Sequence, residues 1–169
     1  MVEFKKIEIT DWAKIQKIAY ETWPNSFGQV IPEEQINYML QLIYNEESLK
    51  EQILEKGHNF ILAEKDNQSL GFTSYEINYN SEPQLMIHKL YILPEAQGLG
   101  IGSKFINLLS EIAKLNHYKQ LRLKVYFENT KAIGFYEKYG FKKNGTETTD
   151  IGNNYTILDN IMVKKLRCL

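Results

Sequence analysis

The segment L-Y-I-L-P-E-A-Q-G-L-G-I-G, residues 90–102, joins two predicted elements. Its apolar start is typical of a β-strand, and Pro94 stops ladder pairing because proline has no amide hydrogen to donate. Glycines then occupy positions 98, 100 and 102. A helix is predicted directly after them, because apolar residues recur at helical spacing at Ile101, Phe105, Leu108, Leu109, Ile112 and Leu115.

The start of this helix differs from the other predicted helix starts. The chain provides caps or acidic first turns elsewhere, at Thr10 or Asp11, Glu33-Glu34, Asn45-Glu46-Glu47 and Asn129. After Gln97 there are only glycines, and Lys104 adds positive charge to the first turn. Free N–H groups at a helix start attract anions, so the sequence predicts a phosphate-binding turn. The alternative is a tight turn in which glycine only relieves steric strain.

Bulk composition is that of an ordinary globular protein. The 169 residues contain 43% hydrophobic and 24% charged side chains, with a net charge of −1. We expect one domain over residues 1–169, with no electrostatic attraction to nucleic acid. Residues 1–56 hold six lysines against ten acidic residues, which would suit a cationic substrate or a solvated helix face equally.

Cysteine and histidine usage predicts neither disulfides nor a metal site. Cys168 is the single cysteine, and His58, His88 and His117 lack the spacing of metal ligands. The first residues have no apolar signal region, and no stretch approaches 18 apolar residues. We therefore expect a cytoplasmic protein that does not enter a membrane.

The hydrophobic pattern predicts a mixed α/β chain in the order β-α-α-α-β-β-β-α-β-α-β-β. The expected strands cover residues 2–9, 58–64, 69–79, 85–93, 121–127, 141–148 and 155–165. The expected helices cover residues 10–23, 32–44, 46–56, 101–117 and 129–140, with a loop at 24–30 after the first.

Two common phosphate-binding motifs are absent from the sequence. A dinucleotide fingerprint G-x-G-x-x-G would need glycine where Ser103 stands, and no G-x-x-x-x-G-K-[ST] occurs. The pattern Q-x-x-G-x-G at 97–102 instead resembles motif A of the GCN5-related N-acetyltransferases. Residues 129–141, N-T-K-A-I-G-F-Y-E-K-Y-G-F, are similar to that family's second signature. The resemblance covers residues 85–141 well and the remaining chain by element order.

The resemblance implies the acyl-CoA N-acyltransferase fold, a central twisted and mostly antiparallel sheet flanked by helices, with acetyl-CoA as cosubstrate and no metal. It places the pyrophosphate on the N–H groups of Leu99 to Ser103, with further contacts from Gln97 and Ser103. The pantetheine arm would pair with the backbone of the strand at Leu90–Ile92 and reach Asn129. Lys131 or Lys138 would contact a phosphate. Asn129 could equally be only a helix cap, and the lysines only solvated. The implied cofactor residues are Leu90, Tyr91, Ile92, Gln97, Gly98, Leu99, Gly100, Ile101, Gly102, Ser103, Lys104, Asn129 and Lys138.

The resemblance also assigns catalytic roles. Tyr136 would donate a proton to the leaving thiolate, its alternative role being aromatic packing on the helix. Many family members carry a glutamate on the strand before the turn, whereas this chain reads L-M-I-H-K-L at 85–90. Imidazole ordinarily titrates near neutrality, so His88 would be the base that deprotonates the amine, or else a strand histidine bonded to a neighbour.

The acceptor is expected to be a primary amine on a small molecule. A looser resemblance to the bacterial spermidine/spermine acetyltransferases covers residues 21–27, 45–53 and 155–166. In that case Glu21, Trp23 and Phe27 could hold a polyamine. Two alternatives are acetylation of a protein or peptide and a non-catalytic domain that senses acetyl-CoA. We expect a monomer or a homodimer.

Overall fold

The computed structural model describes residues 1–167, and Cys168 lies outside the described residues. Over these residues seven strands form one mixed sheet in the order β1-β2-β3-β4-β5-β7-β6, flanked by five α-helices. The expected fold class and element order are confirmed. By contacts the chain divides into two compact units, unit 1 with residues 1–76 and 89–105, and unit 2 with residues 77–88 and 106–167.

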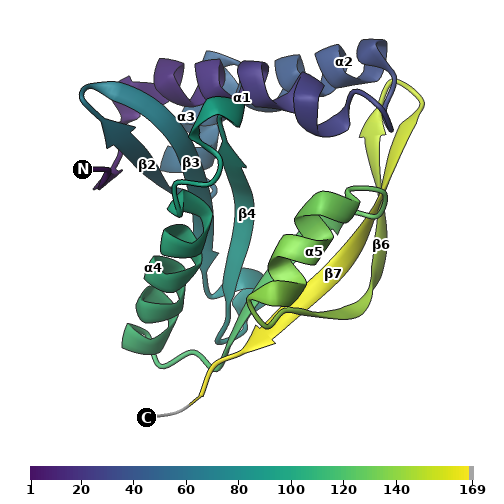
Figure 1. Ribbon diagram of the computed structural model, residues 1–169. Coiled ribbons are helices and arrows are strands. Elements are labelled where there is room, and N and C mark those ends of the chain that lie inside the picture. The colour runs from purple at the N-terminus through teal and green to yellow at the C-terminus, as the bar shows by residue number, and fades with distance from the viewer. Residues whose placement is uncertain (168–169) are drawn as a thin grey trace. The chain divides into compact units, whose positions relative to one another are not determined.

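Unit 1 contains the N-terminal strands and helices, and Figure 1 shows α1 and α2 side by side in it. Strand β1 is short and pairs antiparallel with β2, which in turn pairs antiparallel with β3. The β2–β3 hairpin turns at Asp66 and Asn67, which have positive φ angles of 51° and 62°. The elements are β1 (Glu3–Lys6), α1 (Trp12–Phe27), α2 (Glu33–Tyr44), α3 (Glu46–Leu54), β2 (Asn59–Lys65) and β3 (Gln68–Ile77).

The loop predicted at residues 24–30 was wrong for its first part, because helix α1 extends into it. The helix continues through Pro24 to Phe27, and the N–H of Gly28 still donates to the Pro24 carbonyl at 2.9 Å. Proline inside a helix removes one backbone hydrogen bond, but here the buried rings of Trp23 and Phe27 hold the last turn against the core. The predicted cap was also wrong, because the Asp11 carboxylate accepts from the N–H of Glu8 in the preceding 3-10 turn.

Unit 2 contains the parallel part of the sheet and the C-terminal hairpin seen in Figure 1. Strands β4 and β5 pair in parallel, from Leu85 with Leu121 to Ile87 with Leu123. Strand β7 pairs antiparallel with both β5 and β6. The elements are β5 (Gln120–Tyr126), α5 (Thr130–Lys138), β6 (Lys142–Gly152) and β7 (Tyr155–Lys165); β4 (Leu85–Ile92) and α4 (Ile101–Leu115) each run through the boundary between the units.

The burial of side chains follows the predicted periodicities. Along α4, Ile101, Phe105 and Leu109 are buried as expected, whereas the last predicted core position, Leu115, is exposed. Along β5 the burial alternates strictly, as in a strand with one face against the core. Among residues 1–167, no helix combines the length and the apolar character needed to cross a membrane.

Candidate active site

The turn before α4 belongs to unit 1 and has the predicted geometry. Gly98 and Gly100 take positive φ angles of 84° and 77°, which other residues adopt only with strain. Leu99 between them is 56% exposed, so its side chain does not cover the turn. The Ser103 hydroxyl donates to the Gly100 carbonyl at 2.9 Å. The backbone N–H groups at this helix start therefore lie in an exposed turn without a bulky side chain over them.

Two other helix starts show what a cap from the chain looks like. The Asn45 side chain accepts from the N–H of Ser48 at 2.8 Å, and the Asn129 side chain accepts from the N–H of Ala132 at 3.3 Å. Both caps were predicted and are confirmed. The glycine turn has no Asn, Asp, Ser or Thr at the corresponding position, where Gly100 precedes the first helical residue.

The strand that leads into the turn is held against β3 within unit 1. The Thr73 hydroxyl donates to the Lys89 carbonyl at 2.7 Å, and the N–H of Leu93 donates to the Leu70 carbonyl at 2.8 Å. A Cβ added to Gly71 would stand 2.8 Å from the Tyr91 carbonyl oxygen, so this glycine permits a close approach of the two backbones. The backbone of Leu90–Ile92 is thereby fixed in position.

The side chain of Tyr91 connects this strand to two residues predicted to bind the amine. Its ring centroid lies 5.9 Å from that of Trp23 and 6.5 Å from that of Phe27. Trp23 is 4% exposed and Phe27 is 7% exposed, so both rings pack in the core. Glu21 lies apart from them on the exposed side of α1, at 4.0 Å from Lys17. Unit 1 thus brings the two aromatic residues together with Tyr91, but not Glu21.

Tyr136 lies on α5 in unit 2, enclosed by aromatic side chains. Its ring contacts Phe135 and Phe141 in edge-on geometry, with centroids 5.3 Å and 5.5 Å away. Burial raises the pKa of the Tyr136 phenol well above its ordinary value. The phenol is therefore fully protonated at neutral pH, which a proton donor requires.

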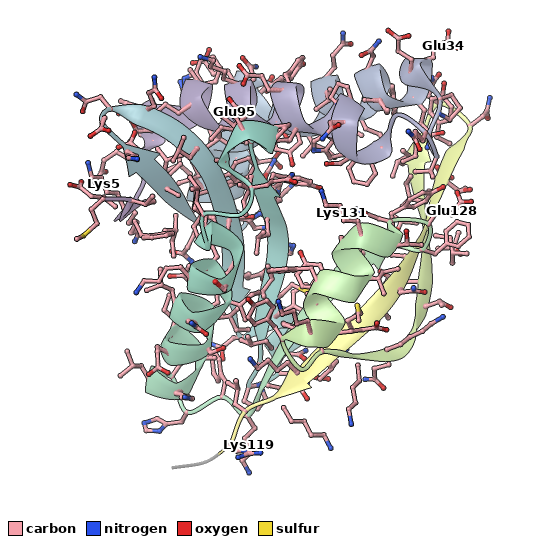
Figure 2. The ribbon with its side chains drawn as sticks, in the orientation of Figure 1. Lys5, Glu34, Glu95, Lys119, Glu128 and Lys131 are labelled. Carbon is pink, nitrogen blue, oxygen red and sulfur yellow. The ribbon has the colours of Figure 1, made fainter. Side chains whose placement is uncertain are left out.

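The other predicted residues of α5 lie at its two ends. Asn129 precedes the helix, and Lys138 is its last residue. Figure 2 shows Lys131 in the first turn of α5, with Glu128 just before the helix. Lys131 and Lys138 are both exposed. Exposure agrees with lysines that are only solvated, and it agrees equally with lysines that bind a phosphate.

His88 lies in unit 2, one residue past the last residue of β4 that pairs with β5. The last paired residues are Ile87 of β4, directly before His88, and Leu123 of β5. The imidazole packs edge-on against the ring of Tyr79, with centroids 5.8 Å apart and planes at 78°. His88 is half-buried, so one side of the ring is held while part of it is accessible.

The sequence reasoning missed three polar residues that share the His88 face of unit 2. Lys124 on β5 follows Leu123 as His88 follows Ile87, and its ammonium forms an ion pair with Glu147 on β6. Asp159 on β7 lies opposite Tyr126 of β5. The alternation in β5 does signal a polar face, but only the strand register shows which residues of β6 and β7 join it.

Comparison with known proteins identifies the family. The family model described as "Acetyltransferase (GNAT) family" matches residues 12–141. This chain belongs to the GNAT acetyltransferase family. It is an acetyl-CoA-dependent N-acetyltransferase, and the predicted motifs at 97–102 and 129–141 lie inside the matched range.

Relatives of this GNAT acetyltransferase differ in the acceptors that their names give. A spermidine N(1)-acetyltransferase of Thermoplasma acidophilum is 28% identical over 153 residues, 88% of this chain and 93% of that protein. The peptidyl-lysine N-acetyltransferase YjaB of Salmonella typhimurium is 37% identical over 71 residues, 41% of this chain and 46% of that protein. The crystal structure of PaiA N-acetyltransferase from T. acidophilum with coenzyme A has a TM-score of 0.82 and 27% identity, covering 98% of this chain and 99% of that one.

Proposed function

We propose that this GNAT acetyltransferase acetylates a primary amine of a polyamine or another small cationic amine. The observation that carries the proposal is the full-length similarity to a protein named for spermidine acetylation. The acidic N-terminal third supports a cationic acceptor, since opposite charge favours encounter. The similarity to the peptidyl-lysine enzyme supports a peptide acceptor as the second candidate, but it extends over fewer than half of the residues.

Acetyl-CoA would be held by the glycine turn and the strand before it. The open N–H groups of Leu99–Ser103 suit a pyrophosphate, because they carry partial positive charge and Lys104 adds a full one. The extended backbone of Leu90–Ile92 suits a ladder with the pantetheine amides. Asn129, Lys131 and Lys138 would contribute from the ends of α5.

Acetyl transfer would use His88 and Tyr136 as proton acceptor and proton donor. A primary amine is protonated at neutral pH, so it must lose a proton before its nitrogen can attack. His88 would accept this proton directly or through water. The C–N bond would then form as the C–S bond breaks, with Tyr136 giving its proton to the departing sulfur, and the second proton lost from the nitrogen would restore the phenol through water. A backbone N–H of Leu90–Ile92 would stabilise the tetrahedral oxyanion.

An acceptor panel tests the proposal. The protein is incubated with acetyl-CoA and spermidine, 1,4-diaminobutane or a lysine-containing peptide, and thiol release is followed. We expect release with the polyamines and little with the peptide. Release with the peptide alone would favour the second candidate. Thermal stabilisation by coenzyme A without release from any acceptor would indicate a sensing domain.

A further inference from the structure

Asp159 occupies an unusual position for a carboxylate. It lies in the middle of β7, opposite Tyr126 of β5 on one side and Glu147 of β6 on the other. Ile157 and Ile161, two positions away in each direction on the same face, are both buried. A half-buried aspartate on a strand between two apolar neighbours is disfavoured unless something compensates its charge.

The described chain supplies that compensation only in part. Lys124, the cation nearest in the register, forms its ion pair with Glu147. Within residues 1–167 the Asp159 carboxylate has no hydrogen bond and no ion pair of its own. Burial raises the pKa of Asp159 to about 6, Lys124 opposes the rise and the nearby Glu147 adds to it. The folded protein therefore carries a carboxylate whose charge is destabilising at neutral pH.

The strand register puts Asp159 on the same face as His88. The β4–β5 register, continued by one residue past its last pair of Ile87 with Leu123, puts His88 level with Lys124, and the β5–β7 ladder places Asp159 beside Tyr126. His88 and Asp159 are thus two strands and two residues apart. Ordinary strand spacing and rise would put their Cα atoms about 12 Å apart, and the register places both residues on one face of the sheet.

We propose that Asp159 binds the second ammonium group of the acceptor while His88 deprotonates the first. Asp159 is then a specificity residue that distinguishes a diamine or polyamine from a monoamine. The Tyr126 ring beside it adds an aromatic surface that favours a cation. This inference depends on the proposed function, since it gives the polyamine a binding group at the same site.

The test compares two amines that differ only in the second ammonium group, 1,4-diaminobutane and butylamine. In Asp159→Asn we expect kcat/KM for 1,4-diaminobutane to fall about tenfold or more, as for loss of a charge-assisted contact. For butylamine it should change less than twofold, and KM for acetyl-CoA should not change. Asp159→Glu, which keeps the charge, should retain part of the preference for the diamine. Glu111→Gln removes one exposed carboxylate from α4 and should leave both amines unaffected.

The outcomes separate this inference from the proposed function. If the wild-type protein acetylates both amines and Asp159→Asn slows both equally or neither, the role of Asp159 is overturned and the proposed function stands. If the wild-type protein acetylates neither these amines nor spermidine, the proposed function fails, and the role of Asp159 fails with it. If it acetylates spermidine alone, an unchanged kcat/KM for spermidine in Asp159→Asn overturns the role of Asp159. An unfolding midpoint for Asp159→Asn at or above that of the wild-type protein excludes misfolding as the cause of any loss.

Discussion

The ammonium nitrogen of Lys89 donates a 2.7 Å hydrogen bond to the side-chain oxygen of Gln52. Gln52 is itself buried, and its amide nitrogen donates to the Ile43 carbonyl at 2.8 Å. Lys89 Nζ also lies 5.6 Å from the ring centroid of Phe60. Helix α3 and strand β4 are thus joined in unit 1 by a lysine whose hydrogen-bond partner is neutral.

This contact predicts a pH-dependent stability. Burial, with a contribution from the charge of Lys56, lowers the pKa of Lys89 to about 7. The unfolded chain binds more protons than the folded chain above that pKa, so this residue makes stability rise with pH up to its unfolded pKa. Between pH 7 and 9 we expect the free energy of unfolding to increase by about 1–2 kcal/mol more in the wild-type protein than in Lys89→Met. Urea denaturation at both pH values measures this, and parallel profiles would contradict it.

Gly71 is predicted to be intolerant of alanine. The added Cβ would meet the Tyr91 carbonyl oxygen at 2.8 Å, so β3 and β4 must move apart. We expect Gly71→Ala to lower the free energy of unfolding by about 1–3 kcal/mol and to raise KM for acetyl-CoA. Gly134→Ala on α5 is the control, because nothing lies within 4 Å of its added Cβ. Since alanine is the better helix former, that variant should be about 0.5–1 kcal/mol more stable. Equal urea midpoints for the two variants would be evidence against the close approach.

Tyr136→Phe tests the proton donor. The substitution keeps the packing against Phe135 and Phe141 and removes only the hydroxyl group. We expect kcat to fall by about 10²–10⁴ with KM for acetyl-CoA nearly unchanged. Tyr139→Phe on the same helix should keep normal turnover. If Tyr136→Phe turns over at the wild-type rate, the leaving thiolate obtains its proton elsewhere.

His88→Asn tests the base through the pH–rate profile. We expect the largest loss of kcat/KM below the pKa of the amine, where the acceptor needs a group to take its proton. The loss should shrink as the pH approaches that pKa. His117→Asn is the control, since His117 lies just beyond α4 with a φ of 59°, which asparagine tolerates. An unchanged profile for His88→Asn would assign the histidine to packing against Tyr79.

Glu64 is predicted to be the most important carboxylate of an ion-pair network in unit 1. Its side chain accepts hydrogen bonds from Lys14 at 3.0 Å and from Lys5 at 3.4 Å, and Lys5, labelled in Figure 2, lies on edge strand β1. The Lys14 hydrogen bond lowers the pKa of Glu64, so its contribution is present above the unfolded pKa and is lost as pH falls through the folded one. We expect Glu64→Gln to cost about 1–2 kcal/mol at pH 7 and less at pH 3. A cost independent of pH would contradict this.

The local features of the fold were predictable from sequence because each depends on a few adjacent residues. The asparagine caps at Asn45 and Asn129 and the glycine turn at Gly98 and Gly100 are of this kind. The passage of α1 through Pro24 was not predictable, since it depends on where Trp23 and Phe27 find partners in the core. Packing outweighed the cost of one lost backbone hydrogen bond.

Residues of the candidate site were predictable where they belong to a sequence motif. They were not predictable where only the strand register brings them together. The glycine turn and Tyr136 stand within signatures that can be read along the chain. Asp159 and Lys124 share a face only because β7 lies between β5 and β6, an order that differs from the order along the chain. The roles of His88, Tyr136 and the cofactor residues stay predictions until the variants above are measured.

Pro24 interrupts the backbone hydrogen bonding of helix α1 near its C-terminal end. Because proline offers no amide hydrogen, the Tyr20 carbonyl one turn earlier receives no bond from it, and the backbone hydrogen-bond ladder of α1 is interrupted there. Trp23 and Phe27, which both contact Tyr91, lie on opposite sides of Pro24 in the sequence. Because both rings are buried, their packing in the core, rather than a continuous backbone ladder, sets the direction of the last turn of α1.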